Sequence, residues 1–104
     1  MIPPNAACAR ALRDGGIDAM AALDFAMPAA LNGLSPEQDQ ELKLVFARLM
    51  AHVVEQFINP AIRAYPELAP DRETWAAIVE ERAALRSKRS AADSAQAPQG
   101  GQAG

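Results

Sequence analysis

Few side chains in this sequence have the chemistry to act on a substrate, and they lie apart along the chain. Nucleophilic catalysis needs a nucleophile beside a base, but Cys8 and His52 fall in different predicted helices. Glu80 and Glu81 are paired carboxylates, yet adjacent residues of a helix point apart. No glycine-rich phosphate loop is present. We therefore expect a protein that is not an enzyme.

His52 and Glu55 are the strongest candidates for a metal site, because residues three apart share a helix face. A metal site needs three or four protein ligands, however, and no second histidine or nearby cysteine completes this one. The same face carries other polar side chains, including Arg48 and Gln56. We expect a solvated polar face, with no metal and no cofactor.

Arg82, Arg86 and Arg89 continue a helix face that begins with the apolar residues Trp75 and Val79. These arginines meet water where the helix leaves the core, contact an acidic partner, or contact phosphate. No aromatic residue lies among them to stack on bases, and the net charge is −3. Direct contact with nucleic acid is therefore not expected, although a small nucleic-acid-binding regulator remains the alternative function.

The composition favours helices that pack closely. Alanine, the best helix former, is the most abundant residue of the 104, and only three Phe, one Tyr and one Trp are present. We predict an all-α fold, a small three-helix bundle with an extra short N-terminal helical segment. The expected divisions are an N-terminal segment (1–34), a helical core (35–86) and a disordered tail (87–104), because the tail has no large apolar residue.

The clearest predicted element runs from Ser35 to about Ile58. Ser35 and Gln38 form a capping box, with a proline at the first helical position between them. Asn59-Pro60 interrupts the helix, because proline lacks the backbone donor that the helix needs, and one further turn is expected before Pro66. The last helix is expected to begin near Asp71 and to run to roughly Ser87.

The first 34 residues are expected to form two short helices. Gly15-Gly16 should break the first, and Asp18 is a good N-cap for the second. Pro28 should disturb that second helix or start a further turn. Asn32-Gly33 is a stop signal, since glycine tolerates the left-handed conformation that ends helices.

The central helix, 35–58, has more apolar surface than an outer helix needs. At 100° per residue, its large apolar side chains cover more than half of the circumference, whereas about 100° is sufficient for one buried face. The stripe and its flanks contain Leu42, Val45, Phe46, Leu49, Met50, Val53, Val54, Phe57 and Ile58. Either the other helices cover both sides of this helix, or a partner or a second copy covers one of them.

The stretch from Leu34 to Ile62 resembles the theta subunit of bacterial DNA polymerase III. The shared features are a capped acidic turn after Leu34 and a Glu-x-aromatic-x-x-Pro-x-Ile pattern formed by Glu55, Phe57, Pro60 and Ile62. Further similar elements are Pro70-Asp71, Trp75 and Glu81-Arg82, although Pro60 and Trp75 lie closer together than in that family. The resemblance implies a non-enzymatic accessory that binds and steadies the proofreading exonuclease subunit of the replicase.

The predicted function is therefore that of a helical protein-binding accessory, whose partner is an exonuclease subunit, another protein or a second copy. The N-terminal residues contain no apolar run of signal-peptide length and the sequence none of membrane-spanning length, so we expect a soluble, cytoplasmic protein with no membrane contact. The residues expected to bind the partner are Leu49, Val53, Phe57, Ile62, Trp75, Arg82 and Arg86.

Overall fold

The structure is a computed structural model that describes residues 1–96. It confirms the all-α prediction, since those residues contain helices and turns but no strand. Three helices are long: α1 (Ala6–Leu31), α2 (Pro36–Val53) and α4 (Arg72–Gln96). Three short elements lie between α2 and α4: the π-helix η1 (Val54–Ile58), the α-helix α3 (Asn59–Ala64) and the 3-10 helix η2 (Pro66–Leu68).

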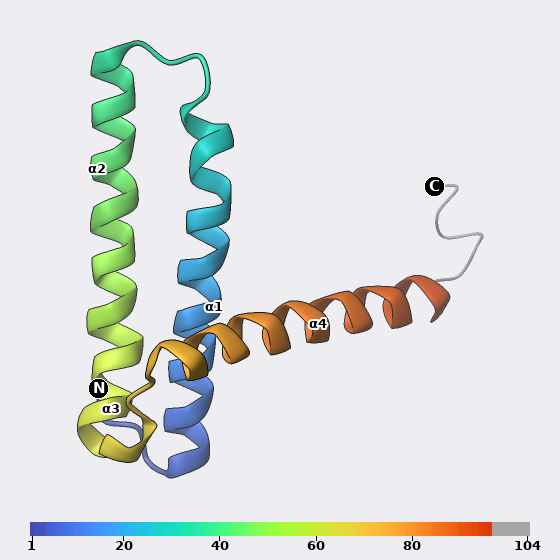
Figure 1. The fold of residues 1–104 in the computed structure, drawn as a ribbon. Coiled ribbons are helices and arrows are strands. Elements are labelled where there is room, and N and C mark those ends of the chain that lie inside the picture. The colour runs from blue at the N-terminus through green and yellow to red at the C-terminus, as the bar shows by residue number, and fades with distance from the viewer. Residues whose placement is uncertain (97–104) are drawn as a thin grey trace.

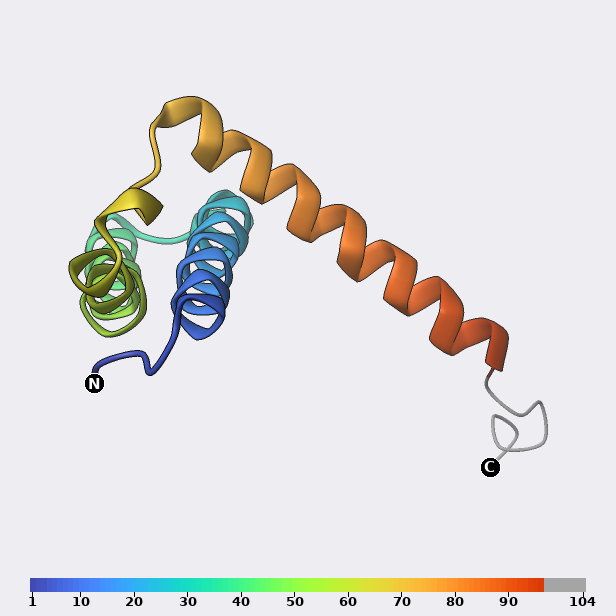
Figure 2. The same ribbon diagram turned by 90° about the horizontal axis from the view of Figure 1, so that it is seen from below.

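The helices α1 and α2 form an antiparallel hairpin, and α4 begins near the end of the hairpin that lies opposite Gly33 and crosses α1 near the middle of that helix (Figure 1). Beyond the crossing, α4 projects away from the hairpin on the side of α1 (Figure 2). The molecule measures 48 × 43 × 27 Å, with a radius of gyration of 17.4 Å. A compact domain of this length has a radius of gyration of about 13 Å, so the arms of this fold extend well beyond a compact shape.

The predicted break at Gly15-Gly16 is wrong, because α1 is continuous from Ala6 to Leu31. Asp18 is correspondingly not an N-cap but lies within α1, and Pro28 is also inside this helix. The actual N-cap is Asn5, whose side chain accepts the backbone N–H of Cys8 at 2.8 Å. The N-terminal segment is thus one of the three long helices, and tertiary packing of α1 overrides the cost of two glycines in a helix.

The start of α2 is confirmed residue by residue. The Ser35 side chain accepts the Gln38 backbone N–H at 3.2 Å, and the Gln38 side chain accepts the Ser35 N–H at 3.1 Å. Gly33, with a φ of 78°, supplies the left-handed turn that follows α1. The short link between the helices makes α1 and α2 antiparallel neighbours.

The helical structure does not stop at Ile58, because a π-helix just before Pro60 lets the chain continue into α3. Val53 is the last residue of α2, and at Asn59 the backbone N–H donates to the Val54 oxygen, five residues back. This wider turn shifts the hydrogen-bond register just ahead of the residue that has no N–H to donate. The chain then continues as α3 to Ala64, which confirms the further turn expected before Pro66.

Asp71 caps the start of α4. Its side chain accepts the Thr74 backbone N–H at 2.7 Å, and its carbonyl oxygen accepts the Trp75 N–H at 2.9 Å. From Arg72, α4 runs to Gln96, past the boundary predicted at Ser87. Residues 97–104 of the predicted tail lie outside the described residues.

Because Asp71 caps α4, the free energy of unfolding should depend on pH in the acid range. The hydrogen bond from the Thr74 backbone lowers the pKa of Asp71 below its ordinary value. The charged cap therefore stabilises the fold at pH values above the ordinary pKa of aspartate, and this contribution is lost as the pH falls through the lower pKa of the folded state. Urea unfolding between about pH 6 and about pH 2 should show this loss in the native chain. Asp71→Asn retains a capping oxygen without the titration, so an equal acid dependence in this variant would contradict the assignment.

Buried residues gather at one end of the hairpin. Ala9, Ala61 and Leu68 form one cluster, against which Leu12 and Tyr65 pack. The other cluster joins α1, η1 and α4 through Ile17, Ile58 and Ile78. The half-buried residues packed against this second cluster are Met20, Val54, Ile62, Trp75 and Val79.

Candidate protein-binding surface

The other end of the hairpin has no buried residue at all. From Asp18 to Phe57, every side chain is at least partly exposed, and α2 has no buried residue anywhere along its length. Large apolar side chains nevertheless line the two facing helices here. Those that are half-buried are Met20, Leu23, Met27 and Leu31 from α1, with Leu42, Phe46, Met50 and Val53 from α2. Two helices alone cannot enclose such a stripe, so its flanks stay in contact with water.

Leu49 and Val45 form the most accessible part of this apolar surface. They lie one helical turn apart on α2, and their exposed fractions are 47% and 53%. Leu44 is also about half exposed, on another side of the same helix. We call the surface formed by Val45 and Leu49, together with the half-buried stripe, the hairpin surface.

Phe57 is 44% exposed, although its helix contacts α1. Its ring is therefore not enclosed by this chain, and Phe57→Ala should cost less than the 3–5 kcal/mol typical of a buried phenylalanine. Val53 is half-buried between the helices of the hairpin. Leu49, Val53 and Phe57 thus lie on the hairpin side of the molecule, where a partner can reach part of each.

Two other residues predicted to bind a partner, Ile62 and Trp75, pack against the cluster of Ile17, Ile58 and Ile78, which we call the isoleucine cluster. Their packing joins α3 and α4 to the hairpin. The structure therefore gives both residues contacts within this chain and separates them from the more exposed Leu49.

The arginines of α4 also have a role within this chain. Arg86 pairs with Asp18 of α1 through Nη1, and the Nε of Arg82 lies 3.9 Å from the other oxygen of Asp18. Asp18 is largely buried, whereas both arginines are substantially exposed. The apolar face of α4 thus ends in ion pairs that join α4 to α1, contacts that sequence reasoning did not anticipate.

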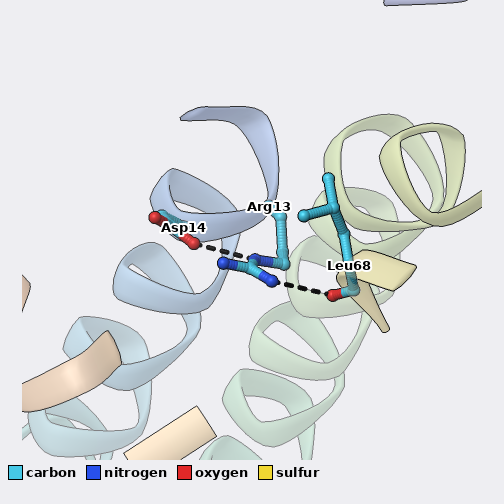
Figure 3. Close-up of polar contacts among 3 residues, drawn as sticks. All are labelled: Arg13, Asp14 and Leu68. Carbon is cyan, nitrogen blue, oxygen red and sulfur yellow. Dashed lines mark hydrogen bonds and ion pairs between the residues drawn. The ribbon is translucent and has the colours of Figure 1, made fainter. Parts of the chain in front are cut away.

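Arg13 is a further polar contact that sequence reasoning missed. As Figure 3 shows, its Nε donates to Asp14 at 2.8 Å and its Nη1 donates to the Leu68 carbonyl oxygen at 2.9 Å. The arginine side chain is only 11% exposed. It therefore ties η2 to α1 across a large separation in sequence, and no local spacing pattern could have revealed it.

Arg13→Ala is expected to lower the free energy of unfolding by about 2 kcal/mol, because the Leu68 carbonyl and Asp14 both lose their charged donor. Arg13→Lys should restore only part of this loss, since an ammonium lacks the planar fork that serves two acceptors. Urea unfolding of both variants measures the effect. Arg10→Ala is the control, because Arg10 is exposed on the same helix; equal losses at both positions would contradict the bridging role.

The groups with catalytic or metal-binding chemistry remain apart. Cys8 is half-buried near the start of α1, and His52 is exposed on α2. Within residues 1–96, no three His, Cys, Asp or Glu side chains come together in a way that could hold a metal ion. None of the helices in that part of the chain has the length and apolar character to cross a membrane.

The geometry leaves an open apolar surface on the hairpin and two polar ties, at Arg13 and Asp18, that hold the remaining helices at its other end. In comparisons with known proteins, no family model, curated protein or solved structure matches the chain.

Proposed function

We propose that this chain is a non-enzymatic accessory protein that binds another protein through the hairpin surface. The observation that carries the proposal is the absence of any buried residue from Asp18 to Phe57, in helices that carry a continuous apolar stripe. Apolar surface left in water is unfavourable by about 25 cal/mol per Å², and a partner that covers the stripe recovers that free energy.

A theta-like role gives this proposal its concrete form. In that form, the chain acts in the cytoplasm of a bacterium, and its partner is the proofreading exonuclease subunit of the replicase. The support is the resemblance of residues 34–62 to the theta family. The matching Ser35 cap and the segment from Glu55 to Ile62 lie at the two ends of the helical stretch that carries Val45 and Leu49.

The nucleic-acid alternative has less support. Two of the arginines that it requires, Arg82 and Arg86, already pair with Asp18. The remaining bases of that face are few, and the chain as a whole carries a net charge of −3. A binder that uses them would show affinity for duplex DNA that falls steeply as salt rises.

The test replaces Val45 and Leu49 together with serine. Both residues are about half exposed in the free chain, so its stability should change little, while binding of the partner should fall by at least about 30-fold, as for loss of an interface anchor. Titration calorimetry with the exonuclease subunit measures the theta-like form. Gln40→Ser, at an exposed polar position of α2, is the matched control.

A photo-cross-linking side chain placed at Leu49 tests the wider proposal in the native cell. We expect one protein to be captured from Leu49 and not from Gln40. Capture of a protein other than the exonuclease would overturn the theta-like form alone. Recovery of the uncross-linked chain from both positions would overturn the binding proposal itself.

A further inference from the structure

A second open surface lies away from the hairpin surface, where α4 leaves α1. From Ala83 to Ala92, every residue of α4 is exposed, and Leu85 is 50% exposed. One face of α4 carries Ile78, Arg82, Leu85 and Arg89, because these residues recur at helical spacing. A shallow hollow runs along this stretch and is lined by Arg82, Leu85, Arg86, Lys88, Arg89 and Ala92.

The helix α1 also has an uncovered face beyond its contact with α4. Phe25 follows Asp18 by seven residues, two helical turns, and therefore lies on the same face of α1. Its ring is 89% exposed, although it is one of the largest apolar side chains of the protein. Ala21 and Ala29, one turn to either side of Phe25, are small enough to let another helix approach closely.

The two open surfaces carry opposite charge. On α1, Asp18 shares the face of Phe25, and Asp24 lies on the flank of that face, about 100° around the helix, while the nearest bases of α1 lie back at Arg10 and Arg13. On the described exposed part of α4, Lys88 and Arg89 follow Arg86, with no acidic residue between Arg82 and Ala92. Within one chain, α4 diverges from α1, so only Asp18 is paired with this basic stretch (Figures 1 and 2).

We propose that a second copy of this chain occupies this space, with α4 of each copy lying across α1 of the other. Leu85 of one copy packs against Phe25 of its partner, and the long side chains of Lys88 and Arg89 reach Asp24 on the flank of that face. Each chain supplies both halves of the contact, a basic arm with one large apolar residue and an acidic face with another, so a two-fold arrangement satisfies both and closes. This surface is separate from the hairpin surface, and the proposal does not depend on the proposed function.

Sedimentation velocity of the full chain, at concentrations up to about 1 mM, tests the association. We expect a dimer whose dissociation constant rises about 30-fold in Phe25→Ala and in Leu85→Ser, each the loss of an interface anchor. Both residues are exposed in the single chain, so circular dichroism should show unchanged helix content. Asp24→Arg and Arg89→Glu should each weaken the dimer roughly tenfold, and together they should restore it, because the charges are exchanged.

Cysteine cross-linking tests the pairing of residues directly. In a Cys8→Ser background, Phe25→Cys and Leu85→Cys chains are mixed and oxidised, and we expect a disulfide-linked heterodimer that neither variant forms alone. Gln40→Cys replaces Phe25→Cys in the control mixture and should not cross-link with Leu85→Cys. A chain that stays monomeric throughout would overturn the proposal. So would a dimer that is insensitive to Phe25 and Leu85 but lost in the Val45 and Leu49 serine variant, and that outcome would place the second copy on the hairpin surface.

Discussion

Replacement of Ile17 with alanine should lower the free energy of unfolding by roughly 2–5 kcal/mol. Ile17 has no exposed surface and contacts Ile58 of η1 and Ile78 of α4, so its side chain joins the three parts of the fold. Few other residues of this small core can close around the resulting cavity. Because small domains are stable by only about 5–15 kcal/mol, Ile17→Ala is expected to remove a large part of the total.

The same chemical change at Ile2 supplies the control, because Ile2 is 83% exposed. Ile2→Ala should change stability by no more than about 0.5 kcal/mol. Urea unfolding followed by circular dichroism measures both variants. Similar losses from the two alanine variants would show that the isoleucine cluster does not join the helices as described.

Alanine substitutions at the two adjacent glycines, Gly15 and Gly16, should have different effects on stability. A Cβ at Gly16 would lie 2.7 Å from Cγ1 of Ile58 and 3.3 Å from Cβ of Phe57, whereas a Cβ at Gly15 would have nothing within 4 Å. Both changes gain about 1 kcal/mol of helix propensity. Gly15→Ala is therefore expected to stabilise the protein, and Gly16→Ala to be less stable than Gly15→Ala by about 1–3 kcal/mol, the cost of overpacking.

Thermal unfolding of the two variants side by side isolates the packing effect, because the propensity gain is common to both. Ile58→Ala combined with Gly16→Ala removes the atom closest to the new Cβ. The loss of unfolding free energy in this double variant should be smaller than the sum of the losses in the two single variants, which is the signature of a direct contact. Equal stabilisation by Gly15→Ala and Gly16→Ala would contradict the close approach of α1 to η1.

These glycines also show where sequence reasoning stops. A local pattern identifies a glycine pair as a helix break, but the close contact with Ile58 that favours Gly16 comes from a residue far along the chain. The Ser35 cap and the Gly33 stop could be predicted in detail because their physics is local. The all-α class followed from composition for the same reason.

The candidate site was predictable only in part. The excess apolar surface of α2 could be found from helical spacing alone, since a rotation angle gives the width of a stripe. Which side of that stripe stays open depends on how α1 packs against α2. The contacts of Asp18 and Arg13 that join the other helices to α1 also link residues distant in sequence. Ile62, Trp75, Arg82 and Arg86 were therefore assigned to a partner although the structure gives each a contact within the chain.

The concentration of buried residues at one end of the hairpin has a consequence for motion. Amide hydrogen exchange follows local opening, and segments with few enclosed apolar contacts open at a small fraction of the global unfolding free energy. The amides of Ile17, Ile58 and Ile78 should be the slowest to exchange, and protection should fall along α1 and α2 towards Gly33. The end of the hairpin that carries the hairpin surface is then also the end that opens most readily, while the isoleucine cluster holds the rest of the fold in place.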